Sequence, residues 1–317
     1  MASQGVGIDV SKEWLDIAIT GGKPPWRVPN TDEGYQTLLA DLKSSTIHRV
    51  VLEASGGYEV GALLALQQAG LPMVRVQPLR ARHFARGLGR RAKTDSIDAW
   101  VLARMAQVAV DELPLWKPLE ETVADLKSVV ERRQQLVVQR DAEKKRLRQA
   151  RSIVRGDLEA SIQSLTARIK LLESKRDDLV ASDAELCEDL AEMESVSGVG
   201  RGTAATLRVI VPELGTLSRG EVAALVGVAP MNRDSGKQRG RRYIQGGRTL
   251  ARNSLYMAIL SAVRWNPVIR EFYKRLLKRK KKPKTAMVAC MRKLIIYLNS
   301  RMRILRNRPT ESAPASA

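Results

Sequence analysis

The alternation of apolar and polar residues over positions 5–110 predicts a domain that mixes strands with helices. Short apolar or alternating runs, each bounded by polar or turn residues, predict strands. They lie at residues 6–10, 14–19, 26–28, 49–53 and 72–77. Helical spacing of apolar residues predicts one helix after an N-cap at Asn30 or Thr31 and a second over residues 60–68. The early strands follow one another through short turns, which favours antiparallel hairpins, whereas helices separate the later strands.

Three antiparallel strands followed by strand–helix alternation are the order expected of an RNase H-like fold. In that layout Asp9 lies on the first strand and Glu53 at the end of the fourth. Pro114 and Pro118 mark the end of this α/β domain. The rest of the chain carries mainly helical patterns, so the expected fold class is α/β followed by an all-α region.

Four carboxylates of the first domain stand where strands or a helix could direct them at one point. Asp9 lies inside an apolar run, Glu53 ends another, and Asp95 and Asp98 share one face of a predicted first helical turn. Burying an unpaired carboxylate is costly. Carboxylate oxygens suit Mg²⁺ or Mn²⁺, and two such ions can clamp the attacking and leaving oxygens of a phosphodiester. Each acid alone could be an ordinary helix-start, capping or solvated residue, but the four together in a basic chain favour a metal site.

Residues 119–194 form a long charged segment without a strand signal. Apolar residues recur there at steps of four and three, from Leu119 to Val137 and again from Leu158 to Leu179. This spacing predicts coiled-coil helices, with a break near Gly156-Asp157 and self-association through them. The alternative is an intramolecular helical hairpin that only spaces two domains. Arg133 and Arg176 occupy seam positions, where they weaken the seam or fix its register.

The region after residue 195 begins with a turn, Ser195-Val196-Ser197-Gly198-Val199-Gly200, that resembles a helix-hairpin-helix. In such a turn Gly198 and Gly200 would let backbone N–H groups approach a DNA phosphate, although similar turns also merely join helices. A capping box at Ser218 starts the next helix. Helices are expected over 250–265 and 285–305, and residues 309–317 are expected to form a disordered tail.

The charge balance points to a polyanionic partner, because the chain of 317 residues carries a formal net charge of +20. Nucleic acid is the first candidate and an anionic membrane surface the second. No apolar run is long enough to span a bilayer, and the N-terminus lacks signal-peptide regions, so we expect a cytosolic protein. Cys187 and Cys290 are expected to be isolated reduced thiols. Neither of the two histidines has another potential metal ligand at a suitable spacing in the sequence, which argues against a zinc site.

Basic residues that could contact phosphates gather in three stretches. These are Arg80, Arg82, Arg86, Arg90, Arg91 and Lys93 before the Asp95 helix; Arg233, Lys237, Arg239, Arg241, Arg242 and Arg248 in and after a glycine-rich loop; and Lys280, Lys281 and Lys282. Residues 270–308 hold fifteen basic residues against Glu271 alone, which indicates a phosphate-binding surface or a disordered arm. Ser235 lies in the glycine-rich loop. Without a nearby histidine to activate it, an ordinary loop serine is the simpler interpretation of the residues themselves.

The chain resembles the DEDD transposases of insertion sequences, also called Piv/MooV-like recombinases and bridge-RNA-guided recombinases. The resemblance rests on short motifs whose order and spacing agree over nearly the whole chain. They are GIDVSK at 7–12, LEASGGY at 52–58, KTDSIDA at 93–99, SGVG at 197–200, GVAP at 227–230, DSG at 234–236 and RNSLYM at 252–257. One departure is Ser55-Gly56-Gly57, where a Thr- or Ser-Gly-x-Tyr pattern is expected; it leaves the chemistry untouched.

The resemblance implies a RuvC-like RNase H domain at 1–115, a coiled-coil linker at 116–194 that mediates oligomerisation, and a transposase domain at 195–308. It implies Asp9, Glu53, Asp95 and Asp98 as Mg²⁺ (or Mn²⁺) ligands and Ser235 as a nucleophile that forms a phosphoserine link to DNA. The carboxylates and the serine could come from different protomers of a dimer or tetramer. A structured non-coding guide (bridge) RNA would pair with donor and target double-stranded DNA, so that base pairing carries the sequence specificity.

Two other functions use the same residues differently. A junction-resolving nuclease would employ the four acids with water as the nucleophile. A non-enzymatic scaffold would bind RNA or DNA without cutting it. A membrane-surface role is the third and weakest alternative.

Overall fold

The computed structural model describes residues 4–308 except 22, 44, 90–94, 109–112, 233, 236–237 and 241, and describes only the backbone of residues 95–97, 234–235 and 238–239. The chain divides into two compact units, residues 1–118 and 119–317. Each unit has its own core, so each is described by itself.

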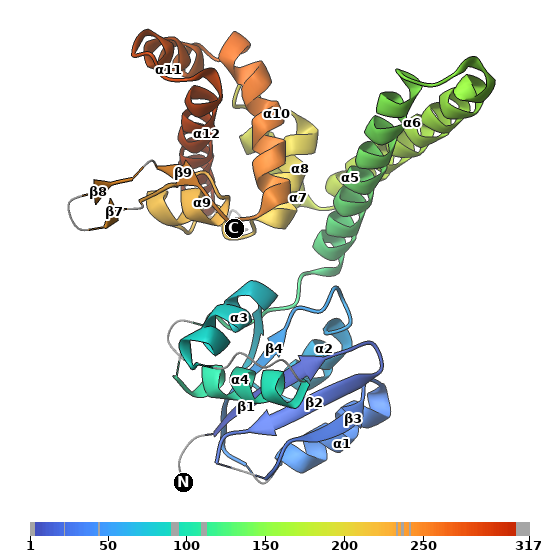
Figure 1. Ribbon diagram of the computed structural model, residues 1–317, viewed down its shortest axis with the longest axis vertical. Coiled ribbons are helices and arrows are strands. Elements are labelled where there is room, and N and C mark those ends of the chain that lie inside the picture. Colours follow the sequence, from blue (N-terminus) through green and yellow to red (C-terminus); the bar gives the residue numbers. More distant parts are fainter. Residues whose placement is uncertain are drawn as a thin grey trace, which may run out of the picture. The chain divides into compact units, whose positions relative to one another are not determined.

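The first unit is built on a five-stranded sheet (Figure 1). Its strands are β1 (Gln4–Val10), β2 (Trp14–Ile19), β3 (Trp26–Pro29), β4 (Ile47–Glu53) and β5 (Met73–Val76), in the spatial order β3-β2-β1-β4-β5. β1, β2 and β3 pair antiparallel, whereas β4 pairs parallel to both β1 and β5. The five predicted strands and the mixed α/β class of this unit are therefore confirmed.

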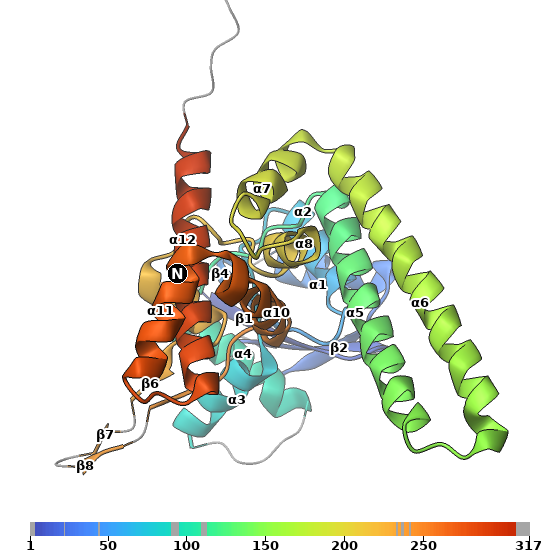
Figure 2. The same cartoon turned by 90° about the horizontal axis from the view of Figure 1, so that it is seen from above.

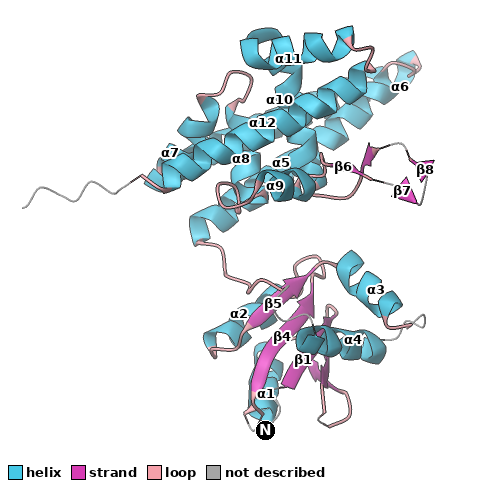
Figure 3. Ribbon diagram, turned by 90° about the vertical axis from the view of Figure 1, so that its left-hand side faces the viewer, coloured by secondary structure: helices cyan, strands magenta, loops and turns pink. Residues whose placement is uncertain are grey.

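Helices cover both faces of this sheet (Figure 3). One face packs against α1 (Asp32–Leu42) and α2 (Val60–Gln68); Val6 and Ile8 of β1 are buried there with Leu38 and Leu63. Thr31 caps α1 by accepting a hydrogen bond from the backbone of Gly34, as its position before an apolar-periodic run predicts. The other face is covered by α4 (Asp95–Val108), beside which lies α3 (Pro78–Gly87).

The second unit is helical apart from one short ribbon in its described residues. Its helices are α5 (Glu121–Leu147), α6 (Ser152–Ala181), α7 (Ala184–Glu194), α8 (Arg201–Ile210), α9 (Arg219–Leu225), α10 (Thr249–Trp265), α11 (Pro267–Lys278) and α12 (Pro283–Arg306). Its core takes apolar residues from all of these helices, and Leu294, Ile295 and Leu298 of α12 are fully buried in it. The helices predicted over 250–265 and 285–305 correspond to α10 and α12.

The two longest helices form an antiparallel hairpin within one chain, and they run side by side in Figure 2. The predicted break near Gly156-Asp157 is wrong, because α5 ends at Leu147 and α6 begins at Ser152, which places Gly156 inside a helix. A glycine at an exposed helical position costs only about 1 kcal/mol, which a 30-residue helix tolerates. The structure thus has the intramolecular hairpin that the sequence left as an alternative.

The apolar residues of the hairpin serve two different contacts. Val123, Leu126 and Val130 of α5 belong to the core of the second unit, whereas Leu136 packs against Leu165 and its neighbours inside the hairpin. Self-association through the hairpin remains a prediction. The most regular apolar residues of α5 and α6 are already buried within one chain.

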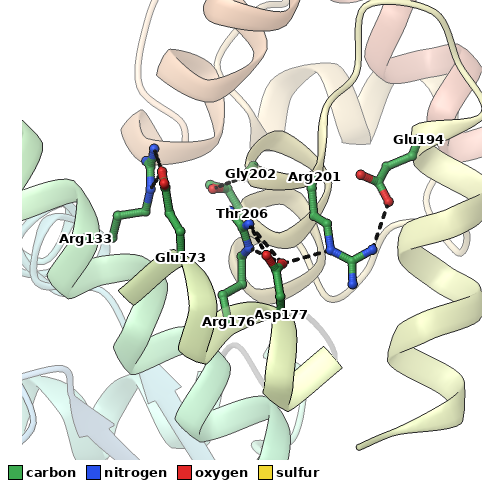
Figure 4. Close-up of polar contacts among 8 residues, drawn as sticks. All are labelled: Arg133, Glu173, Arg176, Asp177, Glu194, Arg201, Gly202 and Thr206. Carbon is green, nitrogen blue, oxygen red and sulfur yellow. Dashed lines mark hydrogen bonds and ion pairs between the residues drawn. The ribbon is translucent and has the colours of Figure 1, made fainter. Parts of the chain in front are cut away.

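Arginines in the seam of the hairpin are paired with acids (Figure 4). Arg133 donates to Glu173 across the hairpin, with 2.8 Å between Nε and Oε1. Arg176 is buried and pairs with Asp177, which also accepts from Arg201 of α8 at 2.8 Å. These contacts fix the register of α5 on α6 and join α6 to α8.

A narrow β-ribbon follows α9. β6 (Pro230–Met231) pairs antiparallel with β9 (Tyr243–Ile244), and further out β7 (Asp234–Ser235) pairs with β8 (Gln238–Arg239). The sequence predicted only a glycine-rich basic loop here. Figure 3 shows β7 and β8 lying beyond β6, away from the helices of this unit.

Candidate active site

Asp9 and Glu53 come to the same edge of the sheet through strand register. β1 and β4 pair in parallel with Gly7 opposite Val51 and Ile8 opposite Leu52, and each acid is the next residue on its strand. Neighbouring strands lie about 4.8 Å apart, and aligned residues of a parallel pair project from the same face. Asp9 shares its face with Gly7, so both carboxylates project on the side that α4 covers.

The packing of α4 on β1 sets which helical residues approach Asp9. A Cβ at Gly5 would lie 2.6 Å from the carbonyl oxygen of Ala103, and a Cβ at Gly7 would overlap the backbone of Ala99. Helix α4 therefore runs antiparallel to β1. Each step of two residues along the strand corresponds to a step of four residues along the helix, because both steps span about 6–7 Å. One further step of the same kind places Asp9 opposite the first turn of α4.

That first turn carries the other two predicted acids. Asp98 is partly exposed, and Asp95 is the first residue of α4; the side chain of Asp95 lies outside the described residues. The structure thus brings Asp9, Glu53 and the turn that holds Asp95 and Asp98 to one edge of the first unit. Among the described side chains, no group of three or more His, Cys, Asp or Glu residues is arranged to hold a metal ion.

A fifth carboxylate of this face was missed by the sequence analysis. Asp16 on β2 lies directly opposite Asp9 in the antiparallel ladder, so the two side chains share a face. Arg27 of β3 holds Asp16 through two hydrogen bonds of 2.9 Å and so compensates its charge. The hairpin pairing of residues 6–10 with 14–19 was predictable, but the register that pairs Asp16 with Asp9 was not.

Ser235 lies in the second unit, on the outer part of the ribbon. Its backbone belongs to β7 and pairs with Gln238 of β8. Its side chain is outside the described residues. The predicted site residues therefore come from both units of the chain.

Several of the predicted phosphate-binding residues are exposed. Arg80, Arg82 and Arg86 lie on α3, the helix that packs beside α4, and Lys280, Lys281 and Lys282 form the turn between α11 and α12. Arg242 is also exposed on the ribbon. The side chains of Arg90, Arg91, Lys93, Arg233, Lys237, Arg239 and Arg241 lie outside the described residues.

Arg248, in contrast, is bound within the chain. Its guanidinium donates to both carboxylate oxygens of Glu213, at 2.6 and 2.7 Å, and to the carbonyl oxygen of Ile210 at 2.7 Å. Burial raises the pKa of Glu213, but the hydrogen bonds and the positive charge of Arg248, together with a backbone hydrogen bond, outweigh burial and leave that pKa below its usual value. This engagement gives Arg248 a structural role that the sequence did not indicate.

The turn of residues 195–200 joins α7 to α8, as its pattern predicted. Gly198 has a φ of +101°, and a Cβ there would lie 2.5 Å from the Cβ of Ala262 in α10. Close packing on α10 therefore accounts for a glycine at this position. Gly200 precedes α8, and a Cβ there would meet no atom within 4 Å.

Two family models match the chain. One, described as a transposase of the DEDD type, covers residues 6–155 and thus the strands and helix that carry the four acids. The other, described as the transposase IS116/IS110/IS902 family, covers residues 190–274 and thus the ribbon. The chain belongs to the IS110 family of DEDD transposases.

The chain is also similar over nearly its whole length to other proteins. The pilin gene-inverting proteins of Moraxella bovis and Moraxella lacunata are each 26% identical to it over 322 residues, which covers 98% of both chains. The protein is therefore a DNA transposase or recombinase, and it belongs to a family whose DEDD residues indicate dependence on a divalent metal. None of its described helices combines the length and the apolar character needed to cross a membrane.

Proposed function

We propose that this transposase moves its insertion sequence by cutting and rejoining DNA strands through a serine-linked intermediate, guided by a structured non-coding RNA. The observation that carries the proposal is the convergence of Asp9, Glu53 and the first turn of α4 on one face of the sheet. The strand order β3-β2-β1-β4-β5, with its parallel second half, supports the assignment of this unit as RNase H-like and RuvC-like.

The acids at this edge form a donor set suited to a hard cation. Asp9, Glu53, Asp95 and Asp98 would hold Mg²⁺ or Mn²⁺, because these ions prefer carboxylate oxygens and the set contains no sulfur or imidazole ligand. The bound metal would neutralise the scissile phosphate and the charge that develops on it. Asp16 stays engaged with Arg27 and is not needed as a ligand.

Ser235 supplies the nucleophile in this proposal. Its Oγ attacks the scissile phosphorus, a bond between Oγ and phosphorus forms, and the bond from phosphorus to one deoxyribose oxygen breaks. The departing oxygen becomes a hydroxyl by taking the proton that the serine loses. The phosphoserine retains the energy of the phosphodiester, so a hydroxyl of another strand can reverse the step without ATP. The outcome is recombination and not hydrolysis, in keeping with the inverting role in the names of the Moraxella relatives.

Guidance by RNA fits the charge of the chain. Aromatic residues make up only 4% of it, and the formal net charge is +20, so it is equipped to grip backbones more than to read bases. The exposed arginines of α3 and lysines of the α11–α12 turn are the surfaces that we assign to phosphate contacts. Base pairing with the RNA would then select the donor and target DNA. A dimer or tetramer would bring two DNA molecules together, with the α5–α6 hairpin as its contact.

Substitution of the nucleophile and of one metal ligand tests the proposal. With DNA spanning a junction of the insertion sequence, Ser235→Ala should abolish both strand exchange and the covalent protein–DNA adduct seen on a denaturing gel. Asp9→Asn should do the same, and both variants should still bind DNA. Ser300→Ala, at an exposed position on α12, is the matched control and should form the adduct normally.

The outcomes separate the alternatives. If Ser235→Ala still cuts DNA, water is the nucleophile and the protein is a junction-type nuclease. If Asp9→Asn combined with Asp98→Asn leaves every function intact, the protein is a scaffold. Sequencing of the RNA that copurifies with the wild type should recover one discrete transcript from beside the gene; a random mixture of cellular RNA would contradict guidance.

A further inference from the structure

The ribbon that carries Ser235 is fastened to the helices at both of its ends. Gly227 closes α9, and Gly246 and Gly247 precede α10; all three have a positive φ, of 75°, 65° and 74°. A Cβ on Gly247 would overlap the backbone of Gly227, and a Cβ on Gly227 would overlap the carbonyl oxygen of Gly246. The two chain segments that enter and leave the ribbon therefore touch, backbone to backbone. We call this contact the glycine clasp.

Arg252 lies over the glycine clasp. From the first turn of α10 its guanidinium donates to the carbonyl oxygen of Gly246, and a second nitrogen lies 3.4 Å from the hydroxyl of Thr249. A Cβ on Gly227 would also collide with this guanidinium, so Arg252 contacts both sides of the clasp.

The clasp is tied further into the unit by Arg248. Its backbone N–H donates to the carbonyl oxygen of Leu225 at 2.8 Å, and its guanidinium holds Glu213 and Ile210. Arg248 and Arg252 thus stand at the N-terminus of α10, where the helix dipole disfavours positive charge. Their positive charge is unfavourable at this end of the helix, and the hydrogen bonds that the two guanidinium groups donate explain why they are there.

The ribbon acts as a lever on the position of Ser235. Met231 pairs with Tyr243 at the base, and Ser235 lies four residues further along the chain, which is at most about 13 Å away. A tilt of about 10° at the base would move the serine by up to about 2 Å at this length. A misplacement of about 1 Å can slow a positioned reaction about 100-fold.

We propose that Arg252 is a positioning residue for strand exchange: it locks the glycine clasp and thereby fixes the direction in which the ribbon presents Ser235. This inference rests on the proposed function, because it takes Ser235 as the reacting group. Arg252 itself touches neither the DNA nor the reacting atoms in this assignment.

The test compares Arg252→Ala and Arg252→Gln with wild type, using the full chain with its copurifying RNA and DNA that spans a junction of the insertion sequence. Three quantities are measured: the single-turnover rate of adduct formation at saturating DNA, the Kd for DNA, and the Tm. We expect the adduct rate of Arg252→Ala to fall about 100-fold while its Kd changes less than about threefold. Arg252→Gln keeps an N–H donor of similar reach and should recover part of the rate. Arg264→Ala, in the last turn of the same helix, should match wild type.

A purely structural role for Arg252 would lower the Tm of both variants and reduce the adduct only in proportion to the folded fraction. That result, or an unchanged adduct rate in folded Arg252→Ala, would overturn the inference. Ser235→Ala, measured in the same experiment, distinguishes a failure of the proposed function from a failure of the positioning role of Arg252. If it still forms the adduct, the proposed function fails; if it forms none while Arg252→Ala reacts normally, only the positioning role is lost.

Discussion

Single residues of this transposase explain how α4 comes close to the sheet beside Asp9. Gly7 occupies the centre of β1, where a glycine weakens a strand because it packs no side chain. Its absent side chain is what lets the backbone of α4 reach the sheet next to Asp9. The motif that contains Asp9 therefore encodes an acid and, two residues earlier, the space that the partner helix needs.

Replacing Gly7 with alanine should separate the acids. The new methyl group would overlap the backbone of Ala99 and Ala103, so α4 must move away from β1. We expect a loss of about 1–3 kcal/mol in the free energy of unfolding, which is typical of overpacking, and weaker Mn²⁺ binding measured by calorimetry. Gly87→Ala, at the end of α3 where a Cβ meets no neighbour, is the control. A Gly7→Ala protein with wild-type stability and Mn²⁺ affinity would refute this account of the site.

At the scale of elements, the sequence was informative wherever one local pattern determined the outcome. Short apolar or alternating runs located every described strand of the first unit, and Ser218 with Glu221 forms the capping box that their spacing indicated. The four acids could be proposed as one set because the local sequence around each acid was enough to predict the strand or helix that carries it. What the sequence could not give was the strand register, which places Asp16 opposite Asp9.

The elements that the sequence misplaced are those that tertiary contacts decide. The break between α5 and α6 does not fall at the only glycine of the segment, because packing of the hairpin outweighs the helix propensity of Gly156. The ribbon strands are two residues long, which is too short for a periodicity to register. The intramolecular contacts of Gly198 and Arg248 were not predictable either, because their neighbours Ala262 and Glu213 lie 64 and 35 residues away in the chain. Their assignment as phosphate contacts stays a prediction.

The contact between α7 and α12 should depend on pH through one carboxylate. The hydrogen bond from Arg301 lowers the pKa of Glu192 below its usual value. A lowered folded-state pKa stabilises the fold above the unfolded-state value of about 4.3, and this contribution is lost as the pH falls through the folded-state pKa. Glu192→Gln should therefore cost about 1–2 kcal/mol at pH 7 in urea unfolding, and the difference from wild type should shrink as the pH falls below the unfolded-state value.

Glu159→Gln, at an exposed position on α6, is the comparison for this experiment and should behave like wild type at every pH. A difference between Glu192→Gln and wild type that stays constant from pH 7 to pH 3 would show that charge on Glu192 is not the cause. It would point instead to packing of the side chain against α12.

At the scale of the whole molecule, some of the positive charge near the C-terminus is bound to oxygens of the same unit. Arg301, Arg303, Arg306 and Arg308 of the C-terminal region bind carboxylates or carbonyl oxygens of the same unit. Arg303, Arg306 and Arg308 are exposed as well, but each is bound to an oxygen of its own unit. The lysines of the α11–α12 turn are exposed, and Lys280 there has a left-handed φ of 56°. A net charge alone would treat these two sets as equivalent, whereas we expect the turn lysines to contribute more to contacts with a phosphate backbone.

This division predicts how DNA affinity responds to salt. Each phosphate contact contributes about −0.9 to the slope of log K against log salt concentration for duplex DNA. Replacing Lys280, Lys281 and Lys282 together by alanine should therefore make the slope shallower by about two to three, with a similar loss for unrelated DNA sequences. The matched control removes three exposed charges from the turn end of the hairpin, by Lys144→Ala, Lys145→Ala and Arg148→Ala. Fluorescence anisotropy from 50 to 300 mM salt measures both. Equal losses of slope in the two variants would mean that DNA responds to net charge alone, whereas a loss confined to the first places the backbone on the α11–α12 turn.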